Sequence, residues 1–370
     1  WYLENVFYNS VSKIYDYIQS HIFDGASIDN EIINLGFWPC GDRDGNPFVT
    51  TETTLKVARK LRQSVLKNYY RDARKIKRRL SFSGVFNIIS DIETRLYESC
   101  ISMDAPLQIT QEELLEKLIE IKQTIQEQHN SLFVEEVDGF INKVKLFGFH
   151  FATMDIRQDS RVHHEVFTNM VKELQEKGDQ TFPANYLDLT SNEQIGVLAK
   201  IKGNINPDDL SEDMVVKTLG SIQAIKTIQK ENGIRGANRY IISNNQTALN
   251  VMETFAMLNL SGFEEGLNVD VAPLFETIDD LEIAPQVMRQ LYQIPEYRAH
   301  VTSRGDKQNI MLGFSDGTKD GGYLMANWGI YKAKEELSKV SREFGIKVIF
   351  FDGRGGPPAR GGGKTSKFYA

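Results

Sequence analysis

The sequence has few cysteines and no long apolar run. Its 370 residues include two cysteines, Cys40 and Cys100, which lack CxxC spacing. They predict neither a disulfide framework nor a zinc motif, and we expect two reduced thiols in a cytoplasmic protein. The longest apolar runs, such as 348–351, have the length of a strand. A stretch of about 18 apolar residues is lacking, so neither a membrane-spanning helix nor a membrane partner is expected.

The sequence also lacks a signal peptide and an initiating methionine. It opens at Trp1 with a helix-like pattern and stops a few residues after a glycine cluster, so we expect an internal fragment of a longer protein. Its length corresponds to two or three domains or to one large barrel. Hydrophobic residues make up 41% and charged residues 25%, which excludes collagen-like, low-complexity and disordered chains.

Positive charge is concentrated in one segment. The net charge is −7, yet residues 56–79 contain eleven basic residues and one acid, which leaves −17 for the rest. A basic run of this kind can bind nucleic acid. Within it, apolar residues recur every three or four positions: Val57, Leu61, Val65, Tyr69, Ala73 and Ile76. This spacing predicts a helix with one face in a core and its charges in solvent. No nucleic-acid-binding motif accompanies the run, so nucleic acid is the weakest candidate partner.

Helical patterns dominate the first 145 residues. Residues 1–26 and 110–130 each place apolar side chains on one face, and Thr110 with Glu113 predicts a capping box. Residues 36–50 are rich in Gly, Asp and Pro and predict a loop. We therefore expect a mainly helical region over 1–145 that includes the GDRDGNP loop.

After residue 145, short apolar runs alternate with helical patterns. The expected strands are 149–156, 239–243, 270–274, 309–314 and 347–351, with helices such as 248–258 and 321–344 between them. This alternation predicts right-handed βα units and parallel strands. The expected fold class is α/β and predominantly helical. Residues 146–370 would form part of a (β/α)8 barrel, with a helical insertion at about 160–235.

Charged residues stand at or just past the ends of four of these strands. Arg157, Glu276 and Asp316 follow three of them, and Asp352 and Arg354 follow the last. The carboxyl ends of the strands form the active-site face of a (β/α)8 barrel. The pattern therefore predicts one site for an anionic substrate and a divalent cation.

The residue types indicate what each group can do. Glu276 and Asp316 offer the oxygen ligands that Mg²⁺ prefers. Arg157 and Arg354 are suited to phosphate or carboxylate. Lys319, three residues after Asp316, is a candidate to balance charge or to transfer a proton.

Other polar residues have simpler interpretations. The acids at 279–282 lie in a helix-start pattern and are expected to stabilise the helix dipole rather than to bind metal. His163 and His164 begin a polar helix and are expected to be exposed, whereas His150 is expected in the core.

Residues 353–363 contain six glycines and two arginines, Arg354 and Arg360. Their spacing is not that of the phosphate-binding GxxxxGK[ST] loop. Glycine lets the backbone approach an anion closely and lets it move, so a closing lid is expected.

Five segments together resemble phosphoenolpyruvate carboxylase. They are 40–47 (CGDRDGNP), 147–160 (FGFHFATMDIRQDS), 271–282 (VAPLFETIDDLE), 311–322 (MLGFSDGTKDGG) and 351–363 (FDGRGGPPARGGG). They occur in family order and cover essentially the whole chain.

The resemblance implies a barrel of the phosphoenolpyruvate/pyruvate type and the carboxylation of phosphoenolpyruvate with bicarbonate to oxaloacetate and phosphate. It also implies Mg²⁺ or Mn²⁺, supply of the tricarboxylic acid cycle, allosteric control, a cytoplasmic location and a homotetramer. Members of the family are well over twice this length. Their catalytic histidine lies upstream of the matching part and their last barrel strands lie downstream, so this fragment alone is expected to be inactive.

Site residues carry over position by position. By resemblance, Glu276 and Asp316 would bind the metal, Arg157 and Arg354 would hold the phosphate, and Lys319 would lie near bicarbonate. The metal would stabilise the enolate oxygen.

Two further positions complete the comparison. Arg360 matches an arginine that the feedback inhibitor aspartate captures. Asp352 stands at the substrate site where the family usually has histidine, and a carboxylate there is unfavourable unless it pairs with Arg354 or the metal. An alternative interpretation is a non-catalytic helical scaffold or regulatory protein with a relic barrel site; the intact set of site residues favours the enzyme.

Overall fold

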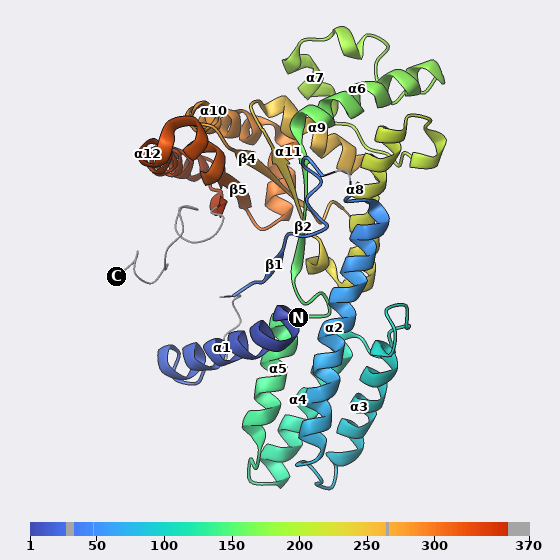
Figure 1. The fold of residues 1–370 in the computed structure, drawn as a ribbon, viewed down its shortest axis with the longest axis vertical. Coiled ribbons are helices and arrows are strands. Elements are labelled where there is room, and N and C mark those ends of the chain that lie inside the picture. Colours follow the sequence, from blue (N-terminus) through green and yellow to red (C-terminus); the bar gives the residue numbers. More distant parts are fainter. Residues whose placement is uncertain (27–32, 47, 264–265, 354–370) are drawn as a thin grey trace. The chain divides into compact units, whose positions relative to one another are not determined.

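The computed structural model describes residues 1–26, 33–46, 48–263 and 266–353 (Figure 1). The chain forms two compact units. The first comprises Trp1–Phe37, Glu52–Met154 and Thr227–Ala237, and the second comprises Trp38–Thr51, Asp155–Lys226 and Asn238–Ala370.

The first unit is mainly helical. A π-helical turn, Leu3–Phe7, leads into α1 (Tyr8–Ile22), and the remaining long helices are α2 (Thr51–Lys77), α3 (Phe86–Cys100), α4 (Gln111–Gln128) and α5 (Val134–Phe147). Thr110 caps α4, because its side chain accepts a hydrogen bond from the Glu113 N–H at 3.1 Å. The predicted helices at 1–26 and 110–130 are therefore confirmed.

The basic helix α2 has one face in the core of the first unit. Leu61, Val65, Tyr69, Ala73 and Ile76 are all buried, as their spacing predicts, whereas Val57 is only partly buried. The prediction that the charges lie in solvent is wrong for Arg62, which is buried. Several of its basic side chains pair with acids of the same unit: Arg59 with Glu231 at 2.9 Å and Lys77 with Glu93 at 2.6 Å. Part of the positive charge of the run is thus balanced within the unit.

Six parallel strands form one sheet in the order β1 to β6. They are β1 (Gly36–Phe37), β2 (Thr153–Asp159), β3 (Arg239–Ser243), β4 (Asp270–Phe275), β5 (Lys307–Gly313) and β6 (Lys347–Gly353). β1 pairs with Thr153 and Met154 of β2 in the first unit, and the other pairings lie in the second. The chain is thus α/β and mostly helical, with a curled parallel sheet; closure to eight strands stays a prediction.

Helices connect and cover the strands of the second unit. α9 (Ala248–Asn259), α10 (Ile278–Gln293), α11 (Pro295–Ser303) and α12 (Phe314–Glu343) follow β3, β4 and β5 and pack against the sheet (Figure 1). Between β2 and β3 the chain forms α6 (Ser160–Glu176), α7 (Ser191–Leu198) and α8 (Asp213–Asn232), with short 3-10 turns. None of the described helices is both long and apolar enough to cross a membrane.

The largest differences from the sequence prediction concern β2, β1 and α12. β2 starts at Thr153 rather than at 149, because Gly148 and Phe151 have positive φ values of 49° and 65° that turn the chain. The two-residue strand β1 lies where a loop was predicted, since a strand that short has no periodicity to detect. α12 starts at Phe314, immediately after β5 and well before the predicted residue 321.

α12 consists of two helical segments that meet at Gly322, whose φ of 77° is not helical. The second segment matches the predicted helix at 321–344, and the glycine-containing run before it, which is typical of a loop, forms the first segment. Asp316 therefore lies in the first turn of a helix rather than in a connecting loop.

Candidate functional site

A cavity of about 320 Å³ lies in the second unit at the carboxyl ends of β2, β4, β5 and β6. Its polar lining residues come from β2, from the residue after β4, from the start of α12 and from β6: Arg157, Glu276, Ser315, Asp316 and Asp352. Its apolar wall consists of Trp38, Leu274, Met311 and Phe351. This edge of the sheet is where the sequence placed the site.

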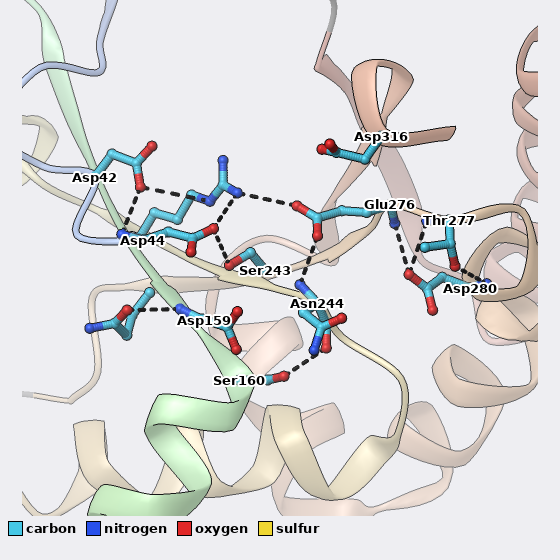
Figure 2. A network of polar contacts seen from close by, with 12 residues as sticks. Asp42, Asp44, Asp159, Ser160, Ser243, Asn244, Glu276, Thr277, Asp280 and Asp316 are labelled. Atoms are coloured by element: carbon cyan, nitrogen blue, oxygen red, sulfur yellow. Dashed lines mark hydrogen bonds and ion pairs between the residues drawn. The ribbon is translucent and has the colours of Figure 1, made fainter. Parts of the chain in front are cut away.

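Arg157 lies within β2 and is held by several carboxylates, and Figure 2 labels three of them: Asp42, Asp44 and Glu276. Its Nη2 lies 2.6 Å from Asp44 Oδ2 and 3.2 Å from Glu276 Oε1, and its Nε lies 3.8 Å from Asp42 Oδ1. The guanidinium carbon lies 5.4 Å from the centre of the Trp38 ring. The Nε–H is buried and has no hydrogen-bond partner among the described residues.

The 41–44 segment supplies two of these carboxylates because it runs beside the end of β2. The Arg157 N–H donates to the Gly41 carbonyl at 3.0 Å, and the Arg43 N–H donates to the Arg157 carbonyl at 2.9 Å. These bonds place Asp42 opposite Arg157 as a parallel bridge. Asp44 is fixed further by Ser243, whose hydroxyl donates to its Oδ2 at 2.8 Å.

Arg43 anchors the segment to α8. Its Nη1 donates to the Lys217 carbonyl at 3.1 Å and to Ser221 Oγ at 2.5 Å. Burial lowers the pKa of Arg43. Arg43 thus points away from the cavity while its neighbours Asp42 and Asp44 point toward Arg157, as Figure 2 shows for the two acids.

Glu276 follows β4 and lies at the centre of the polar network. Its Oε2 accepts a hydrogen bond from the Asn244 N–H at 3.3 Å. Burial raises the pKa of Glu276 to about 7; Arg157 opposes the rise, and the nearby carboxylates of Asp316 and Asp44 add to it. Loss of solvent around the carboxylate is therefore the main cause of the raised pKa.

Gly313 makes room for Glu276. A Cβ at residue 313 would lie 3.0 Å from the Glu276 Cα and 3.2 Å from its Cγ. A side chain at this position would therefore push Glu276 out of place.

Asp316 and Lys319 both lie on the first turns of α12. Asp316 lines the cavity next to Glu276 (Figure 2), and its Oδ1 lies 2.6 Å from the Lys319 ammonium. The Lys319 side chain is 73% exposed and is not among the described residues that line the cavity. The structure therefore brings Arg157, Glu276 and Asp316 together and leaves Lys319 at the rim.

Asp352, at the end of β6, also lines the cavity, and it pairs with Lys334 of α12 at 2.7 Å. The sequence offered Arg354 or a metal as its partner and did not identify Lys334. Arg354, Arg360 and the remainder of the glycine-rich segment lie outside the described residues.

Asp280, one of the acids after Glu276, has a structural role at the start of α10. Asp280 is buried and caps α10: its N–H donates to Thr277 Oγ1 at 3.1 Å, and its Oδ2 accepts from the Thr277 N–H at 3.0 Å. A capping residue engaged in this way is not free to bind a cation.

The prediction for the paired histidines is half wrong. His164 is exposed, but His163 is fully buried, with its Nε2 2.8 Å from the Tyr240 hydroxyl. The polar residues around His163 predicted an exposed helix start, and they did not indicate that the His163 face of α6 is buried. His150 is buried, as predicted.

The donor set at the cavity fits a hard divalent cation. Glu276 and Asp316 both line the cavity, and burial raises the pKa of Glu276. The described part of the chain holds no cluster of three or more His, Cys, Asp or Glu arranged around a metal. Mg²⁺ needs only one or two protein carboxylates, because substrate and water oxygens complete its shell.

Sequence reasoning missed several residues of the site. Asp42 and Asp44 were quoted only as part of a motif, and Trp38, Ser243 and Lys334 had no assigned role. The sequence did contain one signal for Asp42 and Asp44. They stand two residues apart, which places both acids on the same side of an extended segment.

Comparisons with known proteins point to a single family. The family model for phosphoenolpyruvate carboxylase matches residues 1–105 and 98–368. The chain is 32% identical to the phosphoenolpyruvate carboxylase of Nitrosomonas eutropha, over 96% of this chain and 43% of that protein. It is 30% identical to that of Corynebacterium glutamicum, over 90% of this chain and 41% of that protein. The chain thus spans well under half the length of these relatives.

Proposed function

Because the chain belongs to the phosphoenolpyruvate carboxylase family, we propose that it is the central part of an enzyme that carboxylates phosphoenolpyruvate with bicarbonate, giving oxaloacetate and phosphate. The observation that carries this proposal is the cavity in which Arg157 faces Glu276 beside an apolar wall. Phosphoenolpyruvate matches both parts of this cavity. Its phosphate and carboxylate are charged, and its vinyl carbon is uncharged.

Glu276 and Asp316 would hold Mg²⁺ or Mn²⁺. When bound, the cation supplies positive charge for the developing enolate oxygen. Glu276 is suited to this task because its carboxylate is partly desolvated and faces a second carboxylate, so a cation gains more there than at an exposed acid.

Arg157 would hold the phosphate, together with Arg354. Asp44 and Asp42 orient the guanidinium, and the Glu276 contact at 3.2 Å is the weaker of its two close ion pairs. Engagement of Glu276 with a cation would release an Arg157 donor toward the phosphate. Lys319 would take part near bicarbonate, and Arg360 would bind an inhibitory amino acid.

The apolar wall has two uses in this reaction. Trp38 and Phe351 meet edge to face, with ring centroids 6.3 Å apart, and Leu274 and Met311 extend the surface. These side chains would face the vinyl carbon and keep water away from carboxyphosphate, the intermediate formed when bicarbonate attacks phosphorus.

The other features that the sequence patterns predict or the family implies belong to the same proposal. They are the completed (β/α)8 barrel, the division into regions 1–145 and 146–370, the homotetramer, the cytoplasmic location, the supply of the tricarboxylic acid cycle and the allosteric control.

Substrate binding tests the proposal directly. We expect calorimetric titration with phosphoenolpyruvate in the presence of Mg²⁺ to give binding to this chain, and Arg157→Met to remove it. Glu276→Gln should weaken the binding of Mg²⁺ titrated alone. Wild-type protein that binds neither Mg²⁺ nor phosphoenolpyruvate would contradict the assignment.

The chain on its own should not complete the reaction. The catalytic histidine of the family lies outside the part that this chain matches, so we expect no oxaloacetate from phosphoenolpyruvate and bicarbonate. The assay couples oxaloacetate to NADH oxidation by malate dehydrogenase, with Glu276→Ala as the background. Turnover above that background would refute the expectation of inactivity.

A further inference from the structure

Asp352 adds a third acidic residue to the lining of the cavity that already holds Glu276 and Asp316. It stands near the end of β6, in register with Leu312 of β5. An anionic substrate that enters the cavity would meet unfavourable charge from all three groups unless each one is offset.

Lys334 provides that offset for Asp352. Its Nζ lies 2.7 Å from Oδ1 and 2.8 Å from Oδ2, so it contacts both oxygens of the carboxylate. The same ammonium lies 5.6 Å from the centre of the Phe350 ring. The lysine therefore reaches from α12 to the end of β6 and holds Asp352 toward the helix.

We propose that Lys334 is a positioning residue of the site: by pairing with Asp352 it keeps that carboxylate turned toward α12 and balances its charge, so that the cavity accepts phosphoenolpyruvate. This role rests on the proposed function. It is particular to this chain, because the family usually has histidine at the position of Asp352.

If the Lys334–Asp352 pair only stabilised the fold, its loss would leave substrate binding unchanged. Both side chains are about one-third exposed, and ion pairs of this kind contribute little to stability. Lys339 and Glu336 form a comparable pair on the same helix at 2.7 Å, and neither of them lines the cavity. Lys339→Met is therefore a matched control that removes one lysine of α12 from an ion pair without touching the site.

The test removes one or both charges of the Lys334–Asp352 pair and measures the affinity for phosphoenolpyruvate by calorimetry at saturating Mg²⁺. Lys334→Met leaves Asp352 unpaired and should weaken binding about three- to fivefold. Asp352→Asn added to Lys334→Met should restore the wild-type affinity, and Lys334→Arg should retain it. Lys339→Met should bind as the wild type does. Circular dichroism and the unfolding midpoint confirm that each variant is folded.

Two results would overturn the role of Lys334. Wild-type affinity in Lys334→Met would show that Asp352 needs no partner. Equal weakening in Lys334→Met and in the double variant would show that Lys334 acts without Asp352.

Failure of the proposed function would look different. If the wild type binds no phosphoenolpyruvate, the same variants are titrated with inorganic phosphate. If the affinities of the variants for phosphate fall in the expected order, the role of Lys334 is supported although the proposed substrate is wrong. If the variants bind phosphate equally well, the role of Lys334 is overturned too.

Discussion

Asp44 Oδ2 lies 2.6 Å from Arg157 Nη2, although 113 residues separate the two in the chain. Asp44 also accepts the Ser243 hydroxyl at 2.8 Å, so one carboxylate joins the 41–44 segment, β2 and the end of β3. The arginine that faces the cavity is thus oriented by a segment from a distant part of the sequence.

Asp44→Asn should lower the stability of the second unit. The amide keeps the shape of the side chain but loses the charge that pairs with Arg157, which leaves the buried guanidinium less compensated. We expect the free energy of unfolding in urea to fall by about 1–2 kcal/mol. Glu336→Gln, which removes a half-exposed carboxylate from its pair with Lys339, is the control and should change it by less than about 0.5 kcal/mol. Equal effects would contradict a special role for Asp44.

Gly313→Ala should displace Glu276. The new Cβ would lie 3.0 Å from the Glu276 Cα, which is backbone and cannot move aside cheaply. We expect a loss of about 1–3 kcal/mol in stability and weaker Mg²⁺ binding by calorimetry. Gly196→Ala in α7 has open space around its Cβ and should be neutral or slightly stabilising. A Gly313→Ala variant with unchanged Mg²⁺ affinity would argue against this close packing.

Arg43→Met should loosen the 41–44 segment without touching the cavity directly. The variant loses the hydrogen bonds to the Lys217 carbonyl and to Ser221. We expect the amides of Arg43 and Arg157 to exchange with deuterium roughly thirtyfold faster, because the two lost bonds together contribute about 2 kcal/mol. Arg289→Met, which breaks a surface pair with Glu343, should leave both amides protected. Unchanged exchange in Arg43→Met would mean that the segment is held by its backbone bonds alone.

His163 should make the second unit sensitive to acid. Burial, with a smaller contribution from Arg43, lowers the pKa of His163 from 6.5 to about 3, so the folded protein keeps this histidine neutral. Between pH 6.5 and 3 the unfolded chain binds the extra proton. The contribution of a neutral His163 to stability is therefore complete above pH 6.5 and is lost as the pH falls below it.

The measurement compares wild type with His163→Gln in urea at several pH values. We expect the stability of the wild type relative to the variant to fall by about 1.4 kcal/mol per pH unit below 6.5. The comparison removes the opposing effect of carboxylates such as Glu276, which are common to both proteins. His21→Gln, at an exposed position of α1, is the control. A difference that does not change with pH would show that His163 is accessible to protons in the folded state.

The sequence by itself determined features that depend on neighbouring residues. The apolar stripe of α2 follows from a helical repeat, and the cap of α4 follows from Thr110 three residues before Glu113. The placement of Glu276 and Asp316 at one edge of the sheet follows from parallel strands, whose carboxyl ends meet there. Each of these patterns lies within a few helical turns or within a single strand and the residue after it.

Only the tertiary structure decided which side chains meet. Neither the pairing of Arg157 with Asp44 nor that of Asp352 with Lys334 has a local signature, because each joins elements brought together by packing. The burial of His163 likewise depends on Tyr240 of another element, so a polar neighbourhood in the sequence misled the prediction. Charge alone identified the candidate residues, whereas their partners, and hence their protonation and orientation, depend on distances that the fold sets.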